Sequence, residues 1–313
     1  MKKKCNFRNQ ERKRLIRQVR VPIPATCDNR NRWQSFVEMR NYTIFLLLII
    51  FFSSCKDAKE GKGTIELKES ASSNLEVDHL NIWVKNPNIA KERLINIGFT
   101  SVPDSLSAVH EGQGTAGKYF NFLNGYLELI FVYDKNELDE NIQKNKNLDF
   151  IKRADFGKNG ALPFSIALKM KNYNPEKIPF EKVRYHQDWM DDNANIYAAR
   201  NSKKLLQEPS IFIVYPEIES DSFENMSELS IIPDDYAFAR DFYKHPNGAE
   251  KITNIIITST DLDLKTKTIK AVNAITNLTV KNGQEHLMEL YFDNHIQGKT
   301  FDLRPEIPLI INL

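Results

Sequence analysis

The chain is 313 residues long and carries 43 Lys and Arg against 41 Asp and Glu, a net charge of +2. The basic residues are concentrated at the start, because residues 1–54 hold 12 of them and only 3 of the acidic residues. The remainder therefore carries 31 basic and 38 acidic residues, a net charge of about −7, which argues against a nucleic-acid partner.

The first recognisable element is an apolar run at residues 44–52, followed by Ser53, Ser54 and Cys55. It is too short for a membrane-spanning helix, which needs about 20 residues, but it suits the apolar part of a signal peptide. The alternative is a short buried helix that happens to precede a cysteine. The charged, Gly-containing stretch after the cysteine favours a tether.

These patterns divide the start of the chain into three parts. Residues 39–54 are expected to form a signal peptide, and residues 55–74 a tether. Residues 1–38 have no apolar periodicity, and Met39 with Arg40 would make an ordinary start to the signal, so we predict that residues 1–38 are a mis-assigned extension. The alternative is a basic nucleic-acid-binding arm, which would have little use in front of an export signal.

The sequence ending at Cys55 resembles a bacterial lipobox, in which the cysteine is lipidated and becomes the mature N-terminus. The resemblance implies a lipoprotein of the bacterial cell envelope, anchored to the membrane through lipidated Cys55, with its folded domain outside the cytoplasm. The other cysteines, Cys5 and Cys27, precede this point. The mature chain would then have no thiol for a disulfide, a zinc cluster or a cysteine nucleophile.

The folded domain is expected over residues 75–313, and the element pattern of its first part recurs near its end. The expected parts are a first module at about 77–134, an insertion at 135–245, a second module at about 250–293 and a C-terminal tail at 294–313. The insertion is less periodic. Residues 164–170 and 211–215 within it are predicted to be strands, but the order of its elements does not follow from the sequence.

The first module is predicted to contain a strand, a helix and a hairpin. Apolar and polar residues alternate over 77–84, the period of a half-buried strand. Asn86 and Pro87 are typical of a helix start. Asn124 and Gly125 lie between two apolar runs and predict a tight β-hairpin, because both turn residues must adopt positive φ.

The second module repeats this order, with an apolar run at 252–258, helical spacing over 264–275 and a second Asn-Gly pair at 282–283. The strings Leu-Glu-Leu-Ile-Phe at 127–131 and Met-Glu-Leu-Tyr-Phe at 288–292 are nearly identical. Two copies of one supersecondary unit are therefore inferred.

A duplicated β-α-β-β-β unit with Asp-His in its first strand and Leu-Glu-Leu in its last is similar to the vicinal-oxygen-chelate superfamily, which includes glyoxalase I, bleomycin-resistance proteins and extradiol dioxygenases. Within it, residues 110–116, 126–129 and 245–249 resemble the glyoxalase-like domain family. The resemblance spans roughly residues 77–293. It implies an α+β fold in which paired β-α-β-β-β modules form a curled sheet cup, with an inserted middle section.

The resemblance also implies a metal site, because metal-binding members take one ligand from the first strand and a Glu from the last strand of each module. Those positions are His79, Glu128, Asn254 and Glu289. An imidazole and two carboxylates suit a divalent metal such as Zn, Ni, Fe or Mn. Glu128 or Glu289 would be the catalytic base. Asn254 departs from the His or Gln usual in the family's metal enzymes and weakens the expected site.

Five further residues are candidates for ligand contact, because they are polar or aromatic and fall in loops or strand ends near the expected cup. They are His110, Thr115, His186, Trp189 and His245. Each has a structural alternative as a turn, loop or surface residue. The Gly-rich run at 112–115 lacks the ending of a phosphate loop, so a flexible loop over the cup is expected.

Two functional classes remain open. The first is a metal-dependent lyase, isomerase or dioxygenase that acts on a small molecule with vicinal oxygens. The second is a non-catalytic module that binds or sequesters a small molecule on the same fold. His79, Glu128 and Glu289 favour the first class, and Asn254 favours the second. A serine hydrolase is unsupported, because no Gly-x-Ser-x-Gly motif is present.

Overall fold

The computed structural model describes residues 74–148, 150–187 and 189–313, and all of them belong to one structural unit. None of the helices in this part of the chain is long and apolar enough to cross a membrane. The predicted extension, signal peptide, lipidated Cys55 and nearly all of the predicted tether lie outside the described residues.

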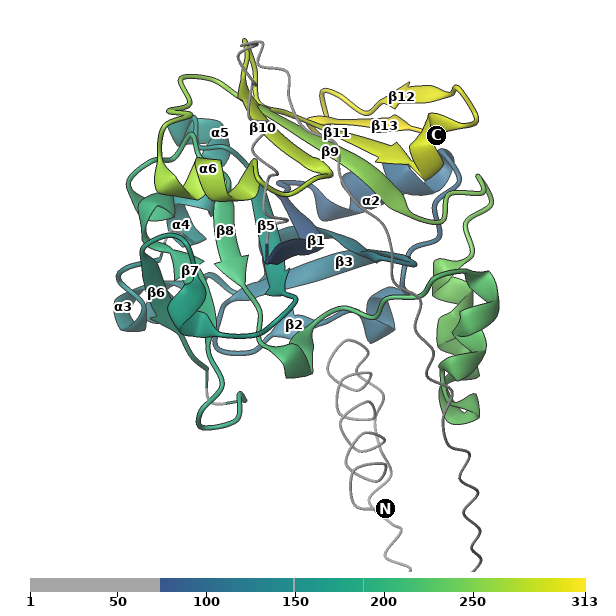
Figure 1. The fold of residues 1–313 in the computed structure, drawn as a ribbon, viewed down its shortest axis with the longest axis horizontal. Helices are drawn as coiled ribbons and strands as arrows, with labels where there is room; N and C mark the ends of the chain where they lie inside the picture. The colour runs from purple at the N-terminus through teal and green to yellow at the C-terminus, as the bar shows by residue number, and fades with distance from the viewer. Residues whose placement is uncertain (1–73, 149, 188) are drawn as a thin grey trace, which may run out of the picture. The chain divides into compact units, whose positions relative to one another are not determined.

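The larger of two sheets has eight strands in the order β2-β3-β4-β1-β5-β8-β7-β6 (Figure 1). Its strands are β1 (Leu75–Trp83), β2 (Val109–His110), β3 (Thr115–Phe122), β4 (Gly125–Val132), β5 (Phe164–Met170), β6 (Lys182–Tyr185), β7 (Ile196–Ala199) and β8 (Ser210–Ile213). The segments between them contain α2 (Pro87–Asn96), η1 (Asp104–Leu106), α3 (Lys135–Lys144), α4 (Phe150–Ala154), α5 (Phe156–Asn159), η2 (Pro175–Lys177) and η3 (Arg200–Lys203).

This sheet consists of two halves with the same strand pairing. In the first half β1 pairs with β4 in parallel, β4 pairs with β3 antiparallel, and β3 pairs with β2 antiparallel. In the second half β5 pairs with β8 in parallel, β8 pairs with β7 antiparallel, and β7 pairs with β6 antiparallel. The halves join through antiparallel β1 and β5. The expected fold class, an α+β domain with paired modules in one curled sheet, is confirmed.

The partner of the first module is not the one expected. The second half of the sheet comes from the section assigned to the insertion, residues 135–245, and not from residues 250–293. Its strands β6, β7 and β8 have four residues each, and its crossover contains only the short turn η2 in place of a helix. The strands predicted at 164–170 and 211–215 correspond to β5 and β8, whereas β6, β7 and η2 leave too few residues to show a strand or helix period.

Residues 252–312 instead form a five-stranded sheet in the order β10-β9-β11-β13-β12. Its elements are β9 (Ile252–Ser259), α6 (Lys267–Val272), β10 (Leu278–Asn282), β11 (Leu287–Phe292), η7 (Asp293–His295), β12 (Thr300–Asp302) and β13 (Leu309–Asn312). The connection to it contains η4 (Pro216–Ile218), η5 (Met226–Ile231) and η6 (Asp234–Tyr243).

The two predicted hairpins have different outcomes. The first hairpin is confirmed, because β3 and β4 pair with Phe122 opposite Gly125. Its turn residues, however, are Leu123 and Asn124, and only Gly125, the first residue of β4, has a positive φ. The one at Asn282 and Gly283 is wrong, since β10 and β11 both pair with β9, which lies between them. The side chain of Asn282 binds the backbone of Leu262 in the loop before α6 instead.

Alternation along the strands gives the eight-stranded sheet two different faces. Leu80 and Ile82 of β1, with Leu127 and Leu129 of β4, point to one face and join a core cluster that also contains residues of α2 and of the five-stranded sheet. The intervening residues point to the opposite face. That face has no second sheet packed on it (Figure 1), and it carries the polar residues described next.

Candidate functional site

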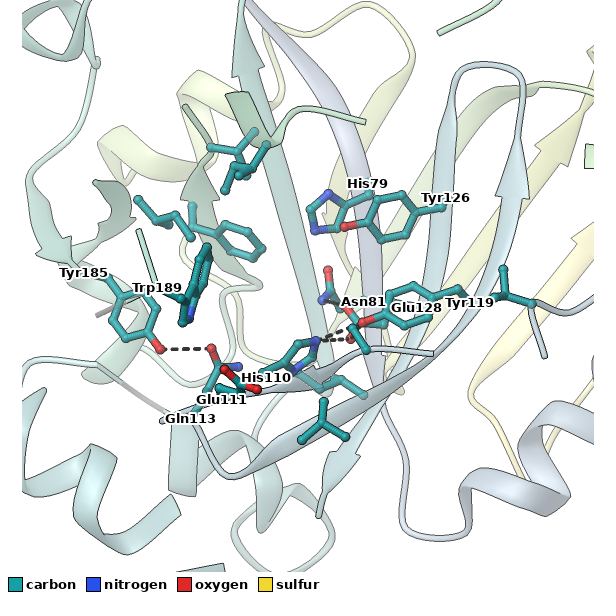
Figure 2. A pocket seen from close by; sticks show the side chains of 18 of the residues that line it. His79, Asn81, His110, Glu111, Gln113, Tyr119, Tyr126, Glu128, Tyr185 and Trp189 are labelled. Atoms are coloured by element: carbon teal, nitrogen blue, oxygen red, sulfur yellow. Dashed lines mark hydrogen bonds and ion pairs between the residues drawn. The ribbon is translucent and has the colours of Figure 1, made fainter. Parts of the chain in front are cut away.

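A cavity of about 470 Å³ lies on this second face of the eight-stranded sheet (Figure 2). Its volume is within the range of small-molecule sites, roughly 300–1,000 Å³. Both halves of the sheet contribute walls. Its polar and aromatic lining residues are His79, Asn81, His110, Glu111, Gln113, Tyr119, Asn121, Tyr126, Glu128, Tyr185, Trp189, Phe212 and Glu217.

A row of polar residues, one from each of five neighbouring strands, runs along this face. Tyr119, Glu128 and Asn81 form the floor of the cup, and Ser165 and Ser210 continue the row beyond it. The strand registers pair Tyr119 with Glu128, Glu128 with Asn81, Asn81 with Ser165, and Ser165 with Ser210. Paired residues in adjacent strands present their side chains on the same face of a sheet. Glu128, Asn81 and Ser165 are all at least 94% buried, so the row is a buried hydrogen-bonding surface.

His79 is oriented by its neighbour in sequence, Asp78. Successive residues of a regular strand point to opposite faces, but the pairing of β1 with β5 shifts between Val77 and His79, which marks a β-bulge at Asp78. The bulge lets Asp78 Oδ1 contact His79 Nδ1 at 2.6 Å. His79 Nε2 has no hydrogen-bond partner in the described part of the chain, and the ring lines the cavity.

Asp78 is itself fixed and ionised. The backbone N–H of Ser220 donates to its Oδ2 at 2.7 Å, and the Ser220 hydroxyl lies 3.0 Å from the same oxygen. Burial raises the pKa of Asp78, but the hydrogen bond and charge of His79, together with the Ser220 N–H, hold that pKa below its usual value. The His79 ring stacks on Tyr126 with centroids 4.2 Å apart, so its orientation is fixed by packing as well.

Glu128 is the carboxylate of the floor. Asn81 Nδ2 donates to its Oε2 at 2.5 Å, and the Tyr119 hydroxyl donates to its Oε1 at 3.2 Å. His110 Nε2 lies 3.2 Å from the same Oε1. Burial raises the pKa of Glu128, but the charge and hydrogen bond of His110, with further contributions from His79 and Tyr119, hold it below its usual value. Burial and the Glu128 charge raise the pKa of Tyr119, which keeps its proton.

The loop at the rim of the cup is tied down. His110 Nδ1 contacts the Thr115 hydroxyl at 2.7 Å, and the Tyr185 hydroxyl donates to Gln113 Oε1 at 3.0 Å, which joins the two halves of the sheet (Figure 2). The N–H groups of Gly112 and Gly114 donate to the Glu137 carboxylate of α3 at 2.5 and 3.1 Å. This carboxylate holds the loop in place over the cavity.

Four of the sequence candidates lie in the cavity lining, and a fifth lies directly behind it. His79, His110, Glu128 and Trp189 line the cavity, and Thr115 supports His110 from behind. Glu128 lines the cavity together with Tyr126 and Ile130 of the same strand.

Asn254 and Glu289 are not brought to the cup, because β9 and β11 belong to the five-stranded sheet. Glu289 lies 3.9 Å from Lys281 Nζ and accepts a hydrogen bond from the Tyr291 hydroxyl. Asn254 pairs with Tyr291 on the neighbouring strand. Their assignment as metal ligands is therefore corrected: it placed the second module in the wrong sheet.

His186 and His245 also lie outside the cavity lining. His186 Nδ1 contacts the carbonyl of Ala194 in an exposed loop. His245 is buried, accepts a hydrogen bond from the Thr100 N–H at its Nδ1, and contacts the Asn121 carbonyl through Nε2. It connects the segment before β9 to the first module.

The residues present do not fit the expected metal centre. Of the four predicted ligands only His79 and Glu128 share the cavity, and His79 Nδ1 and both Glu128 oxygens already have protein partners. The second half of the sheet offers Ser165, Ala167 and Phe212 at the positions beside them. Within residues 74–148, 150–187 and 189–313 no group of three or more His, Cys, Asp or Glu side chains is placed to hold a metal ion.

Sequence reasoning did not single out several residues of the cup. They are Asn81, Gln113, Tyr119, Asn121, Tyr126, Tyr185 and Phe212. The first-module residues among them share a signal, since Asn81 lies two positions from His79, and Tyr126 two from Glu128 on the same strand face. In the second half, Phe212 lies on a strand predicted at residues 211–215, but its place in the sheet did not follow from the sequence. Tyr185 lies on β6, which was not predicted.

No protein-family model matches the chain, and no curated protein does. Among solved structures, it is similar to a hypothetical protein from Staphylococcus aureus, with a TM-score of 0.42 and 13% identity over 76% of this chain and 98% of that one. It is also similar to methylmalonyl-CoA epimerase from Mycobacterium tuberculosis, with a TM-score of 0.31 and 13% identity over 47% of this chain and 91% of that one. At these values neither likeness carries an argument about function, which has to come from the site.

Proposed function

We propose that the chain binds a small organic molecule in the cup of the eight-stranded sheet. The observation that carries this proposal is a cavity of about 470 Å³ whose floor is a buried polar row and whose walls are aromatic. Tyr119, Tyr126, Tyr185, Trp189 and Phe212 supply the apolar contact area. A few fixed polar groups among apolar walls are typical of ligand sites.

The charges of the lining restrict the ligand. Glu111, Glu128 and Glu217 line the cavity, whereas no Lys or Arg of the described residues does. Glu128 is buried and its pKa is lowered, so it is ionised near neutral pH. A buried anionic ligand without a cationic partner would meet repulsion and a large desolvation cost. The ligand is therefore uncharged or cationic, and a phosphate or carboxylate group is disfavoured.

A fluorescent neutral probe tests this proposal. N-phenyl-1-naphthylamine should bind the purified full-length chain with increased fluorescence, because the cup would shield it from water. Ala108 lines the cavity at its rim, so Ala108→Trp should fill the entrance and abolish the increase. Ala237→Trp, which adds the same ring outside the cavity on η6, should bind the probe like the wild type. Equal binding by both variants would refute the cup as the site.

Acid–base catalysis is the second candidate, and the Asp78–His79 pair favours it. A carboxylate on Nδ1 fixes the tautomer of a histidine and makes Nε2 a proton acceptor. On a ligand with vicinal oxygens, Nε2 would take a proton from the carbon next to the carbonyl. The C–H bonding electrons would move onto the carbonyl oxygen as an enediolate, and the proton would return from Nε2 to carbon.

Deuterium incorporation tests this second candidate. Hydroxyacetone in D₂O should exchange its carbon-bound protons faster with the full-length chain than in buffer, as followed by proton NMR. His79→Gln should remove the acceleration, whereas His186→Gln, outside the cavity, should retain it. No acceleration by the wild-type chain would leave binding as the function.

The proposal includes the cellular location expected from the sequence, an envelope lipoprotein anchored through Cys55. It is supported by the apolar run and the Ser53-Ser54-Cys55 ending. Metabolic labelling with a palmitate analogue in a bacterial host should tag the wild-type chain, and Cys55→Ser should abolish the label. Labelling that persists in the variant would contradict lipidation at this residue.

A further inference from the structure

A second, smaller cavity of about 90 Å³ shares part of its lining with the cup. Asn81, Gln113, Tyr185 and Phe212 border both spaces. Beyond them the smaller space, here called the annex, is lined by Trp83, Arg153, Ser165 and Ser210 among others. It continues the polar row of the floor toward the second half of the sheet, since Asn81, Ser165 and Ser210 are neighbours in register.

Asn81 has an unmet hydrogen-bonding group at this junction. The side chain is 95% buried, and its Nδ2 donates to Glu128 Oε2 at 2.5 Å. Its Oδ1 is buried and has no partner in the described residues. Exchanging the amide oxygen and nitrogen would place the oxygen against the Glu128 carboxylate, so the carboxylate fixes the amide orientation. A buried acceptor without a donor costs about 1–3 kcal/mol, and native proteins satisfy most such groups.

Ser165 is the neighbour of Asn81 across the β1–β5 pairing, and its side chain lines the annex. It is 94% buried, and its hydroxyl has no hydrogen-bond partner in the described residues. A hydroxyl both donates and accepts. The annex is thus bordered by Asn81, whose buried acceptor lacks a donor, and by the Ser165 hydroxyl, which can pair with either kind of group.

The charges around the annex oppose one another. Arg153 is buried and donates to the backbone carbonyls of Leu162, Ser202 and Leu206. Its positive charge borders the annex from one side, and the Glu128 carboxylate lies behind Asn81 on the other. An ammonium group would meet Arg153, and a carboxylate would meet Glu128. An uncharged head group avoids both the repulsion from Arg153 and the repulsion from Glu128.

We infer that the annex is the subsite for an uncharged head group that carries a hydroxyl donor. The hydroxyl donates to Asn81 Oδ1 and pairs with the Ser165 hydroxyl, while the apolar or aromatic body of the ligand lies in the cup. The ligand class is therefore an aromatic or alicyclic alcohol. This inference rests on the proposed binding function and specifies the ligand for the same site.

A matched pair of ligands tests it by displacement of N-phenyl-1-naphthylamine from the full-length chain. 2-Naphthalenemethanol and its methyl ether share one aromatic body, but only the alcohol has a donor. The alcohol should displace the probe at about a tenfold lower concentration than the ether. This ratio corresponds to the free energy of one hydrogen bond to a buried acceptor that otherwise has no donor. Asn81→Ala should remove this preference, because the acceptor is gone.

Two further variants keep the test decisive if Asn81→Ala does not fold. Ser165→Val fills the annex with methyl groups and should also remove the preference. Ser259→Ala, a buried serine of β9 outside both cavities, should retain it. Circular dichroism confirms that each variant is folded.

The outcomes separate the subsite from the cup. Equal displacement by alcohol and ether in the wild type means that water alone fills the annex, which overturns this inference and leaves the cup as a binding site. A preference that survives in Ser165→Val also overturns it. Failure of the probe itself to bind, or binding that Ala108→Trp does not reduce, overturns both proposals.

Discussion

The histidines of the first module and its surroundings differ in what their ring nitrogens contact, and this decides their roles. His79 has a carboxylate on Nδ1, and its Nε2 has no partner among the residues that the structure describes, so Nε2 is available to a ligand. His110 is bonded on both sides, to Thr115 and to Tyr119, and stabilises the floor. His245 is bonded on both sides to backbone atoms and is structural. Only the structure separates these roles, because each histidine has polar or turn residues around it in the sequence.

His245 should make the stability depend on pH. Burial lowers the pKa of His245 from 6.5 to about 4 in the folded chain, although the Asn121 carbonyl and the Asp293 charge oppose this shift. Below pH 6.5 the unfolded chain takes up a proton that the folded chain does not. The free energy of unfolding should therefore be highest above pH 6.5 and fall by about 3 kcal/mol as the pH drops to about 4.

The variant His245→Gln checks this assignment by urea unfolding at several pH values. It should be less stable than the wild type near pH 7 and lose much of the slope between pH 6.5 and 4. An unchanged slope would show that other groups cause the acid sensitivity.

At the scale of elements, the first half of the cup could be predicted and the second could not. The alternation over β1, the hairpin at Asn124 and the position of Glu128 were all visible in the sequence. In the second half, the runs at 164–170 and 211–215 were visible as strands and correspond to β5 and β8. The strands β6 and β7 are four residues long and the crossover contains no α-helix, so these parts left no period to detect. The repeat at residues 288–292 correctly predicted a strand. It did not predict the sheet to which the strand belongs, because a local sequence pattern does not specify which strands pair.

The link between the rim loop and α3 gives a prediction at this scale. Glu137→Ala removes the acceptor of the Gly112 and Gly114 N–H groups, so the loop over the cavity should open more often. Amide hydrogen exchange should become about 5- to 30-fold faster at both glycines, the effect of losing about 1–2 kcal/mol of local stability. Mass spectrometry of peptides covering residues 109–115 measures it.

Glu140→Ala is the matched control, because Glu140 lies on the same helix and is exposed. It should leave the exchange of these peptides unchanged. Faster exchange in both variants would mean that the whole helix, and not the Glu137 carboxylate, holds the loop.

At the scale of the whole molecule, the two sheets share one hydrophobic cluster. Phe292 of β11 contributes to it, with its ring centroid 4.8 Å from that of Phe122 in β3 and 5.2 Å from that of Phe99. The side chain is 1% exposed. The five-stranded sheet therefore supports the cup from behind, although it adds no residue to it.

Phe292→Ala should destabilise both sheets together. The lost contacts and the cavity left behind should lower the free energy of unfolding by about 3–5 kcal/mol. Hydrogen exchange should lose protection in β1 and β9 alike, because one cluster holds both. Loss of protection in β9 to β13 alone would show that the five-stranded sheet unfolds independently.

The central claim is that the cup of the eight-stranded sheet is a small-molecule site. A crystal structure of the chain with N-phenyl-1-naphthylamine tests it most directly. We expect the aromatic body between Tyr126, Trp189 and Phe212, with the amine toward the polar floor. Probe density at another surface, with the cup holding only water, would contradict the claim.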